Sequence, residues 1–152
     1  MAKQEVMEAI DREWNTFKSI AETFREEDRV SPGAVGHWNV HEALLHVAAW
    51  DMETMTLVKH FEENGEKPEW LNWPEDELDQ QNERQVAERR NLAPPLIWAH
   101  FKETHEILVR FLSACDEHVF TEDSFTGSSI NGETWQHYQG HGQDLKRFKE
   151  SL

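Results

Sequence analysis

The segment NVHEALLHVAAWDMETMTLVKHFEENG, residues 39–65, predicts a long helix at the centre of the fold. Asn39 is a suitable N-cap, and Glu42 three residues later completes a capping box. Asn64 and Gly65 mark the C-terminal end of this helix. At about 100° per residue, its apolar side chains form two stripes, one with Leu44, Ala48, Met55 and Val58 and another with Ala43, Trp50, Leu57 and Phe61. A helix that is apolar on two sides lies in the middle of a fold or at a subunit interface.

Helical periodicity continues on both sides of this segment. Apolar side chains at spacings of three and four predict further core helices over residues 4–27, 95–115 and 132–149. A polar helix is predicted over residues 75–90, and residues 66–75 and 116–130 are predicted to be loops. No alternating run of β-branched residues predicts a strand. The sequence therefore predicts an all-α fold, a four-helix bundle with an extra polar helix before the third core helix.

The composition limits the class of protein. The 152 residues suit one helical-bundle domain, 1–152, with no stretch approaching the roughly 20 apolar residues that span a membrane. The 30 acidic and 15 basic side chains give a net charge of −15, and no basic cluster exceeds two or three residues, so we expect no nucleic acid partner. A polar N-terminus without the apolar region of a signal peptide, together with the single Cys115, predicts a cytoplasmic protein.

Two histidines on the last predicted helix point to a metal site. His137 and His141 are four residues apart and lie within the apolar arc, so both imidazoles project from one face about 6 Å apart. His46, on an apolar side of the central helix, is the best candidate for a third ligand. Three neutral imidazoles leave coordination positions open for water or a substrate. Because the chain has nine histidines, the alternative is a chance spacing of core histidines that bond to a carboxylate or a carbonyl.

Further side chains are candidates for the walls of a pocket beside these histidines. The aromatic candidates are Trp50, Trp135 and Tyr138, for which a place in the core is the alternative. Glu42 and Glu53 lie within about 40° of His46 on the helix and could accept an imidazole N–H or act as a general base. Their alternative is an ordinary position on the surface of an acidic protein.

Two of these segments resemble a known family. WNVHEALLHVAAWD, residues 38–51, resembles the second-helix signature of DinB/YfiT-like proteins, and TWQHYQGH, residues 134–141, resembles their paired-histidine helix. The polar insert at residues 74–90 makes the ClbS/DfsB branch the most similar. This resemblance implies a four-helix bundle in which His46, His137 and His141 hold a divalent metal ion, most often nickel or zinc.

The resemblance also implies a range of activities. The superfamily includes hydrolases, toxin-protection proteins and metal-dependent thiol transferases that act with mycothiol, bacillithiol or glutathione. We therefore expect a metal-dependent hydrolase or thiol S-transferase that acts on a small electrophile or toxin in a stress or detoxification role, with a low-molecular-weight thiol as cosubstrate in the second case. The alternatives are a non-catalytic protein that sequesters a small molecule and a structural homodimer formed through the second apolar stripe.

The sequence departs from the family pattern at one point. Gly140 and Gly142 flank His141, where the family more often has a helix-favouring residue. Each glycine costs a helix interior about 1 kcal/mol relative to alanine. We expect either a close approach to the backbone here or a locally loose helix.

Overall fold

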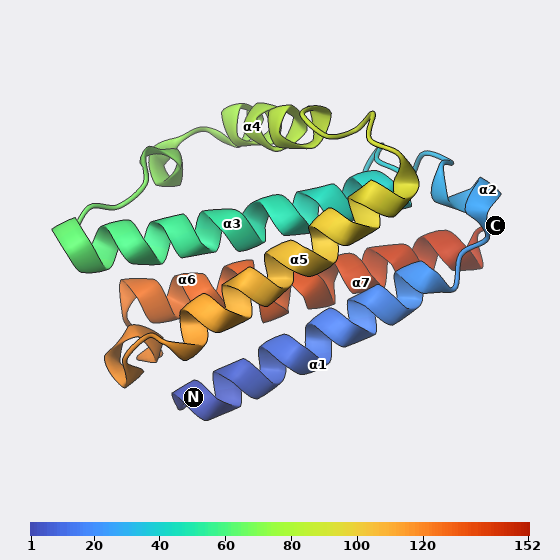
Figure 1. Ribbon diagram of the computed structural model, residues 1–152. Coiled ribbons are helices and arrows are strands. Elements are labelled where there is room, and N and C mark those ends of the chain that lie inside the picture. The colour runs from blue at the N-terminus through green and yellow to red at the C-terminus, as the bar shows by residue number, and fades with distance from the viewer.

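The computed structural model describes all 152 residues and contains no strand, only an isolated bridge between Val35 and Trp38. Its helices are α1 (Lys3–Glu22), α2 (Glu26–Arg29), α3 (Val40–Asn64), the 3-10 helix η1 (Glu69–Asn72), α4 (Glu75–Ala87), α5 (Pro94–Ser113), the 3-10 helix η2 (Glu117–Phe120), α6 (Phe125–Glu133) and α7 (Trp135–Glu150) (Figure 1). The predicted all-α class is confirmed. None of these helices is both long enough and apolar enough to cross a membrane.

Four rows of helix form the bundle. α3 packs against α5, α1 packs against α7, and α6 continues into α7 to complete the fourth row (Figure 1). The polar helix α4 lies outside these rows, along α3, and Val86 is its only buried residue. The core between the rows contains large, fully buried side chains, among them Ile10, Phe17, Leu44, Phe101 and Leu108.

The ends of α3 follow from its local sequence. The Asn39 side chain accepts a hydrogen bond from the Glu42 backbone N–H at 2.8 Å, and the Glu42 carboxylate accepts one from the Asn39 N–H at 3.0 Å. Gly65 ends the helix with a φ of 70°, a left-handed conformation that favours glycine. Most members of both apolar stripes are buried, including Leu44, Val58, Ala43, Trp50 and Leu57, whereas Met55 and Phe61 are half-buried. The central position of this helix is therefore intrinsic to the fold.

The first helix is shorter than predicted. α1 ends at Glu22, and Arg25 has an extended backbone with φ −68° and ψ 154° that separates it from α2. This break lets Phe24 turn inward, where it is 4% exposed and stacks on Phe148 with ring centroids 5.8 Å apart. Phe24 is therefore part of the core although it lies beyond the end of α1.

The prediction of a loop over residues 116–130 is wrong, because η2 and α6 occupy most of it. Ser124 caps α6 by accepting a hydrogen bond from the Gly127 N–H at 3.0 Å. A Cβ atom on Gly127 would lie 1.9 Å from the Thr121 carbonyl oxygen, so glycine is required at this turn. The run of glycine and hydroxyl residues in α6 has low helix propensity, which conceals the helix in the sequence. The chain then bends at Thr134, and α7 begins at Trp135 rather than at Gly132.

Candidate metal centre

The structure brings together the three histidines that the sequence singles out. His137 Nε2 lies 3.0 Å from His46 Nε2, and His46 Nε2 lies 3.2 Å from His141 Nε2. One ligand atom from each residue falls within 4.8 Å of the others. His137 and His141 are about one turn apart on α7, so their side chains lie on the same face of that helix. His46, on α3, lies opposite them. The three rings meet pairwise at angles of 72° to 73°, so they are arranged around a common centre with their edges inward.

A carboxylate holds His141 in the orientation that metal binding requires. His141 Nδ1 lies 2.9 Å from Asp144 Oδ2, and because a carboxylate only accepts, the Nδ1–H is the donor. In the neutral ring this leaves the lone pair on Nε2, facing the other two histidines. Asp144 is in turn paired with Arg147. We did not predict this role of Asp144. The signal in the sequence is that Asp144 follows His141 by three residues on the same predicted helix.

The donor set fits a divalent cation. A single ring proton on His46 cannot point along both of its short contacts at once, whereas a cation placed among three lone pairs contacts all of them. Two nitrogens each about 2.0–2.1 Å from a tetrahedral ion lie roughly 3.3 Å apart, close to the 3.0 Å and 3.2 Å of the two pairs that include His46; the nitrogens of His137 and His141 lie within 4.8 Å of each other. The Nδ1 atoms of His46 and His137 are buried without a partner, so only His141 has its outer nitrogen bonded.

Burial keeps two of the histidines neutral. Desolvation, with a smaller contribution from His141, lowers the pKa of His46 to about 3. Desolvation also lowers the pKa of His137 well below its usual value, with added contributions from the two neighbouring imidazoles. Both rings are therefore unprotonated at neutral pH, and a neutral imidazole is the form that binds a metal ion. The His141 side chain is 21% exposed and His137 is also half-buried, whereas His46 is buried.

Two tryptophans flank His46 and His137. The Trp38 ring lies 4.8 Å from the His46 ring, and the Trp50 ring lies 6.5 Å from the His137 ring, measured between centroids. Both indoles donate to α4, Trp38 to Glu83 Oε2 and Trp50 to Asn82 Oδ1, each at 2.9 Å. Consecutive residues of the polar helix thus fix both walls of the site, so α4 has a positioning role that its sequence does not reveal.

Glu53 and Glu133 are acidic neighbours, and Glu53 is linked to Trp50 through Trp70. Glu53 accepts a hydrogen bond from the Trp70 indole at 2.8 Å, and Trp70 packs edge-on against Trp50 at 4.9 Å. Glu133, at the end of α6, has its pKa raised to about 7 by burial and, to a smaller extent, by the charge of Glu53. We did not predict Glu133. Its carboxyl group can take or give a proton near neutral pH.

The other candidates for the pocket walls have structural roles in the bundle. Glu42 caps α3 and forms an ion pair with Arg90, and the Trp135 indole donates to Asn131 at 2.9 Å. Tyr138 is fully buried and donates to Asp51 Oδ1 at 2.5 Å. These three side chains therefore make their polar contacts within the bundle rather than with the histidine cluster.

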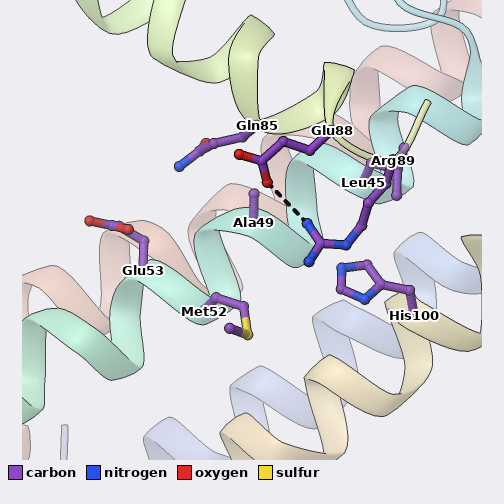
Figure 2. Close-up of a pocket in the computed structure, with 8 residues that line it drawn as sticks. All are labelled: Leu45, Ala49, Met52, Glu53, Gln85, Glu88, Arg89 and His100. Carbon is purple, nitrogen blue, oxygen red and sulfur yellow. Dashed lines mark hydrogen bonds and ion pairs between the residues drawn. The ribbon is translucent and has the colours of Figure 1, made fainter. Parts of the chain in front are cut away.

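A separate pocket opens on another side of α3. It lies between α3, α4 and α5 and is lined by Leu45, Ala49, Met52, Glu53, Gln85, Glu88, Arg89 and His100 (Figure 2). Arg89 and Glu88 form an ion pair across its rim (Figure 2). None of the three clustered histidines lines this pocket, so it is distinct from the candidate metal centre.

The fold is shared with solved structures. The colibactin self-resistance protein ClbS, in complex with a dsDNA, superposes with a TM-score of 0.83 at 15% identity, covering 99% of this chain and 97% of ClbS. An uncharacterised protein from Escherichia coli UTI89 superposes with a TM-score of 0.81 at 14% identity, covering 99% of this chain and 94% of that one. No protein-family model and no curated protein matches the chain. The predicted ClbS-like bundle is therefore confirmed at the level of the fold.

The structure of ClbS overturns one expectation. We expected no nucleic acid partner from the net charge of −15, yet a protein with this fold is in complex with dsDNA. Net charge is a sum over the whole chain, whereas contact with DNA depends on the local arrangement of donors and cations. The acidic composition is therefore no ground for excluding nucleic acid.

Proposed function

We propose that this chain holds one divalent metal ion, nickel or zinc, through His46, His137 and His141 and acts on a small electrophile in a detoxification role. The proposal depends on the close approach of the three imidazoles, in which His46 Nε2 lies 3.0 Å from His137 Nε2 and 3.2 Å from His141 Nε2. The fold of ClbS, a self-resistance protein, supports the detoxification role. An ion with three protein ligands keeps an open position and supplies Lewis-acid activation of water, a thiol or a substrate heteroatom.

The protein's own residues would prepare the site for such chemistry. His46 and His137 enter as neutral ligands, and Asp144 orients His141. Trp38 and Trp50 place apolar rings beside His46 and His137. Glu133, whose pKa is raised to about 7 by burial and by the charge of Glu53, supplies a carboxyl group that is partly protonated at neutral pH and can give or take a proton.

Metal analysis tests the first part of this proposal. Untagged protein reconstituted with nickel or zinc and then desalted should retain about one ion per chain by mass spectrometry of the metal. His137→Ala should retain none, because only two of the three imidazoles remain to hold the ion. His60→Ala is the matched control, since His60 is an exposed histidine on α3. Equal retention by His137→Ala and the wild type would contradict the proposal.

Catalysis and sequestration are separated by a second measurement. An electrophile such as an epoxide, incubated with metal-loaded protein, should be consumed over many turnovers, with or without an added low-molecular-weight thiol. Consumption that needs the thiol indicates an S-transferase, and consumption without it indicates a hydrolase. If the electrophile raises the melting temperature equally in metal-free protein and is not consumed, the chain is a sequestering protein instead.

Duplex DNA is a second ligand that we propose to test. The observation in its favour is the complex of ClbS with dsDNA. Fluorescence anisotropy of a labelled duplex, titrated with wild-type and His137→Ala protein, measures binding and whether the metal centre contributes to it. Unchanged anisotropy up to high micromolar protein would remove DNA as a ligand of this chain.

A further inference from the structure

Helix α4 is weakly anchored for its length. Of its residues Glu75–Ala87, only Val86 is buried. It packs along α3 outside the four rows of the bundle, and irregular segments join it to the rest of the chain at both ends (Figure 1). Burial of an apolar face supplies most of the stability of a helix in a protein, and segments with little such burial open most readily. Separation of α4 from α3 therefore costs little apolar contact.

The contact under the C-terminal end of α4 is incomplete. A cavity of about 190 Å³ lies between Gln85, Glu88 and Arg89 on one side and α3 and α5 on the other (Figure 2). Gln85 Oε1 is buried and has no hydrogen-bond partner. A buried acceptor without a partner costs free energy that exposure to water recovers. At this end, neither dense packing nor complete hydrogen bonding holds α4 in place.

Polar contacts at the surface hold α4 instead. Glu83 accepts a hydrogen bond from the Trp38 indole at 2.9 Å and forms an ion pair with Arg90, which also pairs with Glu42 of α3. The Glu83 and Arg90 side chains are 39% and 36% exposed, so water competes for these contacts. Glu83 thus joins α4 both to a tryptophan and, through Arg90, to the first turn of α3.

The side of α3 that faces α4 is also the side from which His46 projects. Glu42 pairs with Arg90 and Trp50 donates to Asn82, and these two α3 residues lie about 40° to either side of His46 around the helix. Trp38, just before α3, has its ring 4.8 Å from the His46 ring. His46 is only 5% exposed. The tryptophans that bond to α4 therefore help to cover His46.

Helix α7 covers the other side of His46 and is the more firmly anchored of the two. It places His137 and His141 against His46, and its Tyr138 and Leu145 are fully buried in the core. Movement of α7 would break up the core, whereas movement of α4 exposes one buried side chain, Val86. Helix α4 is therefore the element that can move to expose His46.

We propose that α4 is a lid that opens as a unit, releases Trp38 and Trp50 and gives a metal ion or small ligand access to His46. This inference rests on the proposed function for the purpose of the motion, because it treats His46 as a ligand of the metal centre. The motion itself is measured on metal-free protein.

Hydrogen exchange of metal-free protein tests whether α4 opens. Under conditions where exchange reports the population of the open state, the α4 amides should exchange together and faster than those of α3 and α5. Glu83→Ala should raise the α4 exchange rate about tenfold, because it removes a hydrogen bond to a charged acceptor and an ion pair. Glu77→Ala is the matched control, since Glu77 is an exposed glutamate on the same helix and should leave the rate unchanged.

Chemical modification tests whether that opening exposes His46. Metal-free protein is treated with diethyl pyrocarbonate, which modifies accessible neutral imidazoles, and the rate at each histidine is followed by mass spectrometry of peptides. The rate at His46 should rise in Glu83→Ala by the same factor as α4 exchange. His60, an exposed histidine on α3, is the internal reference and should react at the same rate in both proteins.

Two results would overturn the proposal. The first is protection of the α4 amides equal to that of α3, which means that α4 separates only when the whole chain unfolds. The second is faster α4 exchange in Glu83→Ala without faster modification of His46. If Glu83→Ala lowers the melting temperature of the whole chain, Asn82→Ala replaces it and must itself speed modification of His46. Because both measurements use metal-free protein, failure of the lid and failure of metal binding are distinguished.

Discussion

The imidazole of His141 donates from Nδ1 to Asp144 Oδ2 at 2.9 Å, and this bond directs its Nε2 lone pair toward His46. Asp144 is the only carboxylate bonded to any of the three clustered histidines. The affinity for a metal ion should therefore depend on this residue more than on any other outside the ligand set.

Asp144→Asn should weaken metal binding about 10- to 100-fold, the range typical of a lost partner to a metal-binding histidine. Competition with a chelator of known affinity measures this change. Arg147→Gln is the control, because Arg147 contacts Asp144 and not the histidine. Equal metal affinity in Asp144→Asn and the wild type would show that the hydrogen bond does not act on the centre.

Tyr138→Phe should lower the free energy of unfolding by about 1–3 kcal/mol and leave metal affinity unchanged. The reason is that the phenol serves the core, where it donates to Asp51, a fully buried carboxyl group whose pKa is raised by that burial. Without the phenol, the only remaining polar neighbour of the Asp51 carboxyl group is His105, whose Nδ1 lies 3.5 Å from Asp51 Oδ2. Urea unfolding and metal titration of the same sample check both parts. A loss of metal affinity at unchanged stability would instead place Tyr138 in the site.

Glu133→Gln should change the dependence of stability on pH. In the folded chain the pKa of Glu133 is about 7, above its ordinary value of 4.5, so the folded state holds a proton that the unfolded state has lost. Stability therefore falls as pH rises from about 4.5 to 7, by up to about 2–3 kcal/mol at one residue. Urea unfolding should find Glu133→Gln more stable than the wild type at pH 8, with no difference below pH 4.5. Parallel profiles for the two proteins would contradict this assignment.

Gly140→Ala should stabilise the protein by about 1 kcal/mol without affecting metal binding. A Cβ atom on Gly140 meets nothing within 4 Å, and one on Gly142 meets only Ile20 Cδ1 at 3.8 Å, so neither position shows a close approach to the backbone. Thermal unfolding measures the gain. Gly127→Ala is the contrasting variant, which should destabilise strongly because its Cβ would collide with the Thr121 carbonyl. If Gly140→Ala destabilises the chain, α7 needs its flexibility there.

The sequence by itself determined the features that depend on neighbours along the chain. The capping box of Asn39 and Glu42 and the two apolar stripes of α3 are set within a few turns of helix. The same local geometry places His137 and His141 on one face and His46 on an apolar side of α3. That these three histidines bind a metal ion stays a prediction. They could be chosen from the sequence because the spacing along a helix determines the side from which each side chain projects.

Only the tertiary structure decided which residues meet across helices. Asn82 and Glu83 on α4 hold Trp50 and Trp38, and the partner of Tyr138 is Asp51 rather than a substrate. Helix α6 was concealed by its glycine and serine residues and forms because Ile130 is fully buried and Ser124 caps its first turn. Periodicity shows which face of a helix is buried, but the partner on that face is chosen by how the helices pack, and that choice depends on the whole chain at once.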